Sequence, residues 1–383
     1  MKLEEYVARF DEEPGYLDFA RVGPIGAAIV EEEAALMPLL ARARFGSLDG
    51  LLGMEQHERV RAAVARLTGF RPDQVVFQPN TSQGLMHAMF GITGGVALSA
   101  AEFPSLTFAA TRAAQALGVV QPLWMTTDPG KVTPDGLRGQ DLPASVRAVA
   151  VSLVDFRTGY LCDLEGIRQV IGDRLLIVDA TQGFGVVDAP YAVADIVVAG
   201  GQKWPRAGWG TGFLALSDRA LEHLTPVWSG FTATDVEGTP MDEVPEPTRG
   251  PGKFQVSNPD PIAQARFAAA LEEVASVGVA YIGAGVADRV TRLIDLADEF
   301  ALPVTSPRPL SERAGIVTVQ PPADQLTALA ASLHNHGITV TVRRGVDRAG
   351  TVRLSPHAST DEETFGMLRA AFTSFATAVR LPG

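Results

Sequence analysis

Short apolar runs rich in β-branched residues alternate with stretches of helical spacing over roughly residues 45–225, and this alternation constrains the fold most. We predict strands at 74–78, 96–99, 122–126, 148–153, 175–179, 196–199 and 212–216. Helical spacing falls between them, at 56–67, 83–90, 106–116 and 164–171. Elements that alternate in this way form a mostly parallel sheet covered by helices. The sequence therefore predicts an α/β protein with a seven-stranded sheet.

A second, smaller α/β region follows a long connection. Residues 226–261 are rich in proline, glycine and acidic side chains, and connections of this length are usually functional or mobile. Amphipathic helices are expected at 262–277 and 278–301, followed by a β-α-β alternation at 315–320, 325–336, 339–343 and 351–354. We expect an N-terminal segment, 1–20, that packs on the small domain, a large cofactor-binding domain at 21–255, and a small C-terminal domain at 256–383.

Composition narrows the range of functions. The formal net charge of −12 and the scattered arginines argue against nucleic acid and against anionic membrane surfaces. The sequence has neither a membrane-spanning apolar run nor a signal pattern at its start, so we expect a cytoplasmic protein. Its single cysteine, Cys162, fits a reducing compartment, and we assign no metal site.

Two groups of opposite charge follow neighbouring apolar runs. Lys203, one of four lysines, comes shortly after the run at 194–198, and burial favours the neutral amine that forms a Schiff base with an aldehyde cofactor. Asp179 ends the preceding apolar run, where a buried carboxylate needs a cationic partner such as a pyridinium nitrogen. A lysine whose tip reaches solvent and a helix-capping aspartate are the structural alternatives. If the two strands are neighbours, both groups lie at the ligand-binding edge of the sheet.

Three further segments carry complementary chemistry. Thr81 and Ser82 lie in a strand-to-helix turn that can hold a phosphate, although simple helix capping would also explain them. Phe103 follows the strand at 96–99 and could stack on a cofactor ring or belong to the core. Arg353 interrupts an apolar strand, where its guanidinium could bind an amino acid's carboxylate or face solvent on an edge strand.

Seven segments in this order resemble the class V aminotransferase group of fold-type I pyridoxal 5′-phosphate (PLP) enzymes. That group includes cysteine desulfurases, kynureninases, isopenicillin N epimerase-like proteins and the C–S lyase of ergothioneine synthesis. The similar segments cover nearly the whole chain, and they are Tyr16–Pro24, Asn80–Gly84, Glu102–Ser105, Asp155–Gly159 and Asp179–Gln182, then Gln202–Trp204 with Gly208–Phe213, and Val352–His357.

The resemblance implies PLP as cofactor and assigns roles to individual residues. Lys203 would carry the Schiff base and Asp179 would pair with the pyridine nitrogen, while Arg353 would bind the substrate carboxylate. The other cofactor-binding residues it implies are Thr81, Ser82, Phe103, Asp155, Gln182 and Gln202, with Asp155 standing where Asn is more usual. It also implies a homodimer with the active site at the interface and a small amino acid as substrate.

Departures from the family pattern bear on the reaction. The family's cysteine desulfurases take up sulfur on a cysteine in a loop of the C-terminal domain, whereas Cys162 falls in the large domain. We therefore expect that this chain is not a persulfide-forming cysteine desulfurase. We expect β-elimination on a cysteine-derived or other β-substituted amino acid, with transamination between an amino acid and a keto acid, or kynureninase-like hydrolysis, as alternatives.

Overall fold

A computed structural model describes residues 1–42, 55–128, 130–236, 238–344 and 350–380. Its central feature is a seven-stranded sheet with the order β1-β7-β6-β5-β4-β2-β3. The strands are β1 (Val75–Phe77), β2 (Gly94–Ser99), β3 (Val120–Met125), β4 (Val146–Ser152), β5 (Leu175–Asp179), β6 (Ile196–Gly200) and β7 (Gly212–Leu216). β7 runs antiparallel to both of its neighbours, and the other pairs are parallel. The predicted mostly parallel seven-stranded sheet is confirmed, with strand limits shifted by no more than two residues.

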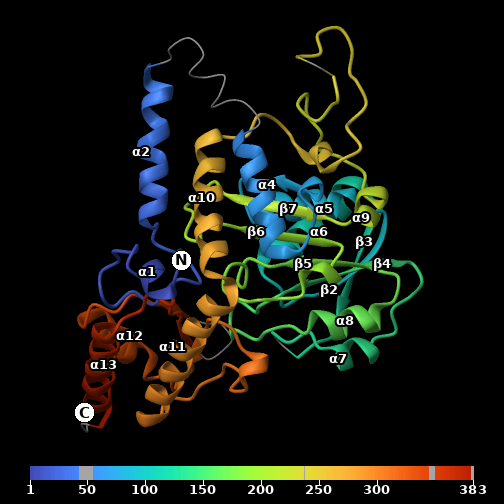
Figure 1. Ribbon diagram of the computed structural model, residues 1–383. Helices are drawn as coiled ribbons and strands as arrows, with labels where there is room; N and C mark the ends of the chain where they lie inside the picture. Colours follow the sequence, from blue (N-terminus) through green and yellow to red (C-terminus); the bar gives the residue numbers. More distant parts are fainter. Residues whose placement is uncertain (43–54, 129, 237, 345–349, 381–383) are drawn as a thin grey trace.

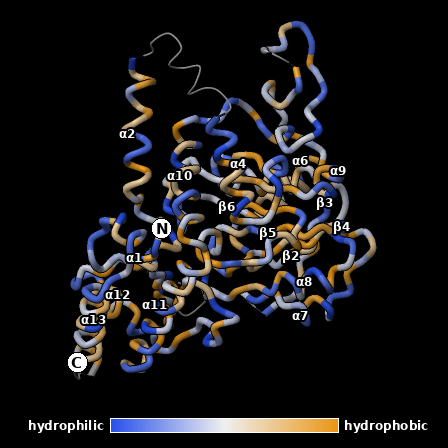
Figure 2. Tube along the Cα trace, viewed as in Figure 1, coloured by the Kyte–Doolittle hydropathy of each residue, from blue (hydrophilic) through white to orange (hydrophobic). Residues whose placement is uncertain are grey.

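Helices cover both faces of the sheet because the inner strands are predominantly apolar. Every residue of β5, β6 and β7 is buried, as expected for strands covered on both sides. The helices that precede or follow the strands of the large sheet are α4 (Glu55–Thr68), α5 (Thr81–Gly91), α6 (Pro104–Leu117), α7 (Pro134–Arg138), α8 (Leu164–Ile171) and α9 (Asp218–His223). Figure 2 shows the apolar residues concentrated on these central strands. The covered sheet leaves its strand ends, rather than its faces, available for a ligand.

The small domain lies beside this sheet and includes the N-terminal segment (Figure 1). Its sheet has the order β8-β10-β9, formed by β8 (Val317–Val319), β10 (Thr351–Leu354) and β9 (Thr341–Arg343). The remaining helices are α1 (Leu3–Val7), α2 (Ala27–Arg42), α10 (Pro261–Val277), α11 (Val279–Glu299), α12 (Leu326–Asn335) and α13 (Glu362–Arg380). Backbone bridges join Tyr16 to Thr339 and Asp18 to Ser355, so the start of the chain adds to the small sheet.

Helix α10 connects the two domains. It packs against α2 and α4 on the large-domain side and continues into α11 after Gly278, whose φ of 95° only glycine adopts readily. Within the described residues no single helix is both long and apolar enough to cross a membrane. Helices α10 and α11 meet both criteria only as a pair, with a bend of 83° between them.

Candidate active site

A cavity of about 740 Å³ opens at the carboxyl ends of β4, β5 and β6. This is the edge of an open α/β sheet where ligands bind. Both domains and the N-terminal segment contribute to its wall, which is lined by Ala20, Arg21, Pro79, Asn80, Thr81, Ser82, Phe103, Ser105, Ser152, Val154, Phe156, Asp179, Thr181, Gln182, Gln202, Lys203, Trp209, Gly210, Thr341, Arg343 and Arg353. The predicted site residues therefore come together in one cavity, with the exception of Asp155.

Lys203 lies in a loop that leaves β6 and is held by backbone contacts. The amide of Arg206 donates to the Lys203 carbonyl at 3.0 Å, and the amide of Gly23 donates to the Gln202 carbonyl at 2.9 Å. Burial lowers the pKa of the Lys203 amine to about 8; the nearby Asp179 carboxylate opposes this shift, and the Arg353 guanidinium adds to it. Lys203 therefore has far more neutral amine near neutral pH than an exposed lysine has.

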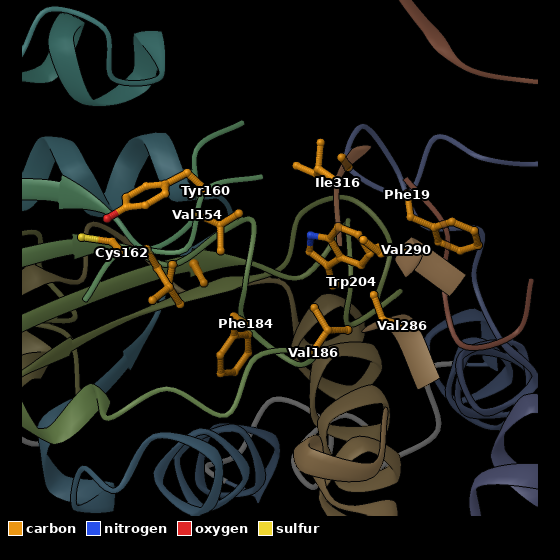
Figure 3. Packing of buried hydrophobic residues seen from close by; sticks show 14 of the residues in the cluster. Phe19, Val154, Tyr160, Cys162, Phe184, Val186, Trp204, Val286, Val290 and Ile316 are labelled. Carbon is orange, nitrogen blue, oxygen red and sulfur yellow. The ribbon is translucent and has the colours of Figure 1, made fainter. Parts of the chain in front are cut away.

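Trp204 anchors the same loop in the core. Its indole is fully buried, and Figure 3 shows it among side chains of the N-terminal segment, α11 and the segment before β8. Its Nε1 donates to Gln182 Oε1 at 3.1 Å, and Gln182 Nε2 donates to the Ala20 carbonyl at 2.8 Å. These contacts fix the orientation of the Gln182 amide at the cavity wall.

Asp179 ends β5, which is the direct parallel neighbour of β6 as the sequence analysis required. The Thr181 amide donates to its Oδ1 at 3.0 Å. Burial raises the pKa of the carboxyl, opposed by Thr181 and by the charge of Lys203. The few contacts of the Asp179 carboxylate do not offset the cost of burying its charge. A nearby cation would stabilise this charge, and a protonated pyridine nitrogen supplies one.

Hydroxyl groups surround the N-terminus of α5 at the other end of the cavity. Asn80 caps the helix by accepting from the Gln83 amide at 2.9 Å. The Thr81 and Thr181 hydroxyls are 2.7 Å apart, as are those of Ser82 and Ser105. Amides and hydroxyls at a helix N-terminus suit a phosphate dianion. An acid, an amine and a phosphate cradle in one cavity fit PLP.

An aromatic pair forms the wall between these ends. The Phe103 and Phe156 rings meet edge to face at 5.0 Å, and Lys203 Nζ lies 5.4 Å from the Phe103 centroid. Phe103 thus lies beside the lysine, in the position expected of a ring that stacks on a cofactor bound to Lys203. The sequence does not identify Phe156 as a site residue, because an aromatic residue in a loop carries no signal of what it faces.

Arg353 projects from β10 of the small domain into the cavity. Its Nη1 donates to the Phe156 carbonyl at 2.9 Å, and its Nη2 lies 3.3 Å from Asp18 Oδ1. Both side chains of this ion pair are buried. Asp18, a partner that the sequence did not reveal, fixes the guanidinium at the substrate end of the site.

Asp155 does not line the cavity. Its Oδ1 accepts from the amides of Arg157 and Thr158 at 3.0 and 2.8 Å, and its Oδ2 pairs with the Arg157 guanidinium at 3.0 Å. Asp155 therefore organises its own turn, and its contact with the cofactor stays a prediction.

These features define a PLP-dependent enzyme of fold type I, with the cofactor residues at the strand ends of the large domain. The comparisons with known proteins specify the family. The family model described as "Aminotransferase class-V" matches residues 50–379, so the chain belongs to that family. The expected resemblance and the expected PLP cofactor are confirmed.

Three individual proteins are similar to this chain over most of its length. The chain is 25% identical over 325 residues to a "Probable cysteine desulfurase" of Pyrococcus abyssi (strain GE5 / Orsay), covering 80% of each protein. The apo cysteine desulfurase of Thermococcus onnurineus NA1 superposes with a TM-score of 0.79 and 23% identity over 93% of each chain. The cystine C-S lyase C-DES, solved with its reaction product cysteine persulfide, gives a TM-score of 0.82 and 18% identity over 94% of this chain and 97% of its own.

These relatives contradict one expectation. We expected the chain not to be a persulfide-forming cysteine desulfurase, yet the curated relative that covers most of it carries the cysteine desulfurase name. The expectation rested only on the position of Cys162. That thiol is indeed buried, and burial raises its pKa. A sulfur-accepting cysteine, however, is separate from the cofactor and carboxylate residues that act on the substrate, so its absence from one loop does not exclude the activity.

Proposed function

We propose that this class V PLP-dependent enzyme cleaves the carbon–sulfur bond of a cysteine-derived amino acid by β-elimination. The observation that carries the proposal is the placement of Lys203, with a pKa lowered to about 8, in one cavity with Arg353 and Asp179. A lowered pKa makes the neutral form of an amine more accessible near physiological pH, and in that form it can act as a general base toward an α-proton. Relatives named for desulfuration and for C–S cleavage support the choice of a sulfur substituent.

Each residue has a defined task in this reaction. Arg353 holds the α-carboxylate through paired hydrogen bonds, which orients the α-proton toward the lysine. Lys203 Nζ removes that proton and, once protonated, can return it to the departing sulfur. Bound PLP supplies an electron sink for the pair left at the α-carbon. Asp179 stabilises the proton on the ring nitrogen, and Thr81, Ser82 and the α5 amides hold the phosphate.

The overall reaction balances without an oxidant or reductant. The S-substituted cysteine and one water give pyruvate, ammonium and the free thiol. With cystine as substrate the sulfur product is cysteine persulfide, which is the product that accompanies C-DES.

Product analysis tests the proposal. Purified holoenzyme is incubated with cystine and with S-substituted cysteines, and pyruvate, ammonia, alanine and keto-acid exchange are measured. We expect pyruvate and ammonia in equal amounts, lost in Lys203→Ala and kept in Lys131→Ala, a lysine outside the cavity. Amino exchange with a keto acid without pyruvate would replace elimination by transamination, and alanine with released sulfur would indicate desulfuration.

The expected assembly and location also remain proposals. We propose a cytoplasmic homodimer whose partner subunit lies near the cavity mouth. Trp209 at the mouth is 66% exposed and Phe231 in the long connection is 50% exposed, and burial of both in a dimer would be favourable. Analytical ultracentrifugation of wild type and Trp209→Asp would test this assembly.

A further inference from the structure

A second arginine of the small sheet faces the same cavity as Arg353. β9 pairs with β10 so that Thr341 lies opposite Arg353 and Thr351 lies opposite Arg343. Side chains two residues apart on a strand share a face, so Arg343 and Arg353 are diagonal neighbours on one face of the sheet. Both line the cavity.

The two guanidinium groups are held around one acceptor. Arg353 Nη1 donates to the Phe156 carbonyl at 2.9 Å, and Arg343 Nη2 approaches the same oxygen at 3.4 Å. The two donor nitrogens are therefore no farther apart than the sum of those distances. The Arg343 guanidinium also lies over the Phe156 ring, 4.7 Å from its centroid, which fixes its position.

Among the residues that the structure describes, Arg343 differs from its neighbours in having no carboxylate partner. Arg353 pairs with Asp18 and Arg157 pairs with Asp155, whereas no ion pair of Arg343 occurs among the residues that the model describes. Burial lowers the pKa of Arg343 to about 10, and the charge of Arg353 contributes to the shift. A partly buried cation beside a second cation is stabilised by an anion, and the cavity is open to a ligand that carries one.

We propose that Arg343 binds a second carboxylate of the substrate, located beyond the scissile carbon–sulfur bond from the carboxylate that Arg353 holds. This inference rests on the proposed β-elimination and names its substrate class. The preferred substrates are cysteine disulfides and thioethers whose sulfur substituent ends in an anionic group, as in cystine. Arg343 is then a specificity-determining residue rather than a participant in proton transfer.

A structural role is the competing explanation, because Arg343 could serve only to pack on Phe156. The two roles make different predictions for substrates that differ in charge alone. A packing residue affects all substrates alike, whereas a carboxylate-binding residue affects only the charged one. The mixed disulfides of cysteine with 3-mercaptopropionate and with 3-mercaptopropionamide provide such a pair, since they share the leaving sulfur and differ in one terminal group.

The experiment compares pyruvate formation from these two disulfides by wild type, Arg343→Met and Arg344→Met holoenzyme. Arg344 is the adjacent, exposed arginine and does not line the cavity, so its variant is matched in charge. We expect wild type to prefer the acid over the amide by roughly 10- to 100-fold in kcat/KM, the range for one charge-assisted, paired hydrogen bond. Arg343→Met should lose this preference while amide turnover changes less than a few-fold, and Arg344→Met should keep it.

Direct binding separates this inference from the proposed function. Titration calorimetry of PLP-loaded Lys203→Ala with the acid and the amide measures affinity without turnover. Tighter binding of the acid that depends on Arg343, without pyruvate from wild type, would support the second carboxylate site and overturn the β-elimination. Pyruvate formed equally from acid and amide would overturn the role of Arg343 and leave the β-elimination intact. A preference that persists in Arg343→Met, or an equal fall for both substrates, would also overturn it.

Discussion

The Glu102 carboxyl is expected to make the stability of this protein depend on pH. It immediately precedes Phe103 and accepts from the Ser152 amide at 3.2 Å and from the Ser152 hydroxyl at 2.5 Å. Burial raises its pKa from 4.5 to about 7; these hydrogen bonds oppose the shift, and the charges of Asp179 and Asp155 add to it. A pKa that is higher in the folded state stabilises the protein below the unfolded value and loses that contribution as pH rises through the folded value.

The magnitude follows from linkage. A carboxyl pKa that changes from 4.5 in the unfolded chain to about 7 in the folded protein corresponds to at most about 3 kcal/mol at high pH, and to about 2 kcal/mol between pH 5.5 and 8.5. Glutamine keeps the shape and removes the titration. The free energy of unfolding of Glu102→Gln, relative to wild type, should therefore increase by about 2 kcal/mol over this pH interval.

Urea denaturation of both proteins at several pH values measures this difference, and subtraction removes the contributions of other titrating groups. The exposed Glu165→Gln is the matched control and should give a difference that is flat with pH. A difference for Glu102→Gln that is equally flat would refute the reasoning. A difference that falls with rising pH would mean that the carboxylate is stabilised, rather than destabilised, in its loop.

Three further predictions concern the lysine loop. Because burial lowers the pKa of Lys203 to about 8, the rate at which cofactor-free protein takes up PLP should rise with pH to a plateau, with a midpoint near 8. Stopped-flow absorbance measures this rate, and a midpoint above 10 would contradict the prediction. The Arg206 side chain is 1% exposed and pairs with Glu12 at 2.5 Å. Arg206→Met leaves the Glu12 carboxylate without its partner and should lower the free energy of unfolding by about 3–5 kcal/mol. The double variant that also carries Glu12→Gln should recover part of this loss. A β-carbon at Gly23 would collide with the Lys203 carbonyl oxygen, so Gly23→Ala should weaken PLP affinity in equilibrium dialysis, and unchanged affinity would show that the loop adapts.

Local sequence patterns predicted most of the strands of the large domain. The apolar runs that end in Asp179 and precede Lys203 predicted adjacent strands, because consecutive strands of α/β proteins often pair, and β5 and β6 do so. Helices α2 and α13 were not predicted from the sequence. Helix α2 contains Pro38 and only one buried residue, Ile29, so its apolar pattern is weak.

The substrate end of the site was much harder to predict. Arg353 could be proposed from its place in an apolar strand. Arg343 reaches the same cavity, and Asp18 reaches Arg353, only through long-range pairing. Which side chains a three-stranded sheet turns toward a cavity depends on its register and on what packs beside it. Neither is recorded in the spacing of residues along the chain.

The ion pair between Asp18 and Arg353 joins residues 335 positions apart, which has a consequence for synthesis. All seven strands of the large sheet are complete by Leu216, so the sheet that carries the phosphate cradle and Asp179 can form while the chain is still being translated. The carboxylate-binding wall requires β9 and β10 and forms only after Arg353 has left the ribosome. Because Trp204 packs against α11, the Lys203 loop is also completed only after α11 has been made. The phosphate end of the site can therefore form before the end that carries the lysine and the carboxylate-binding arginine.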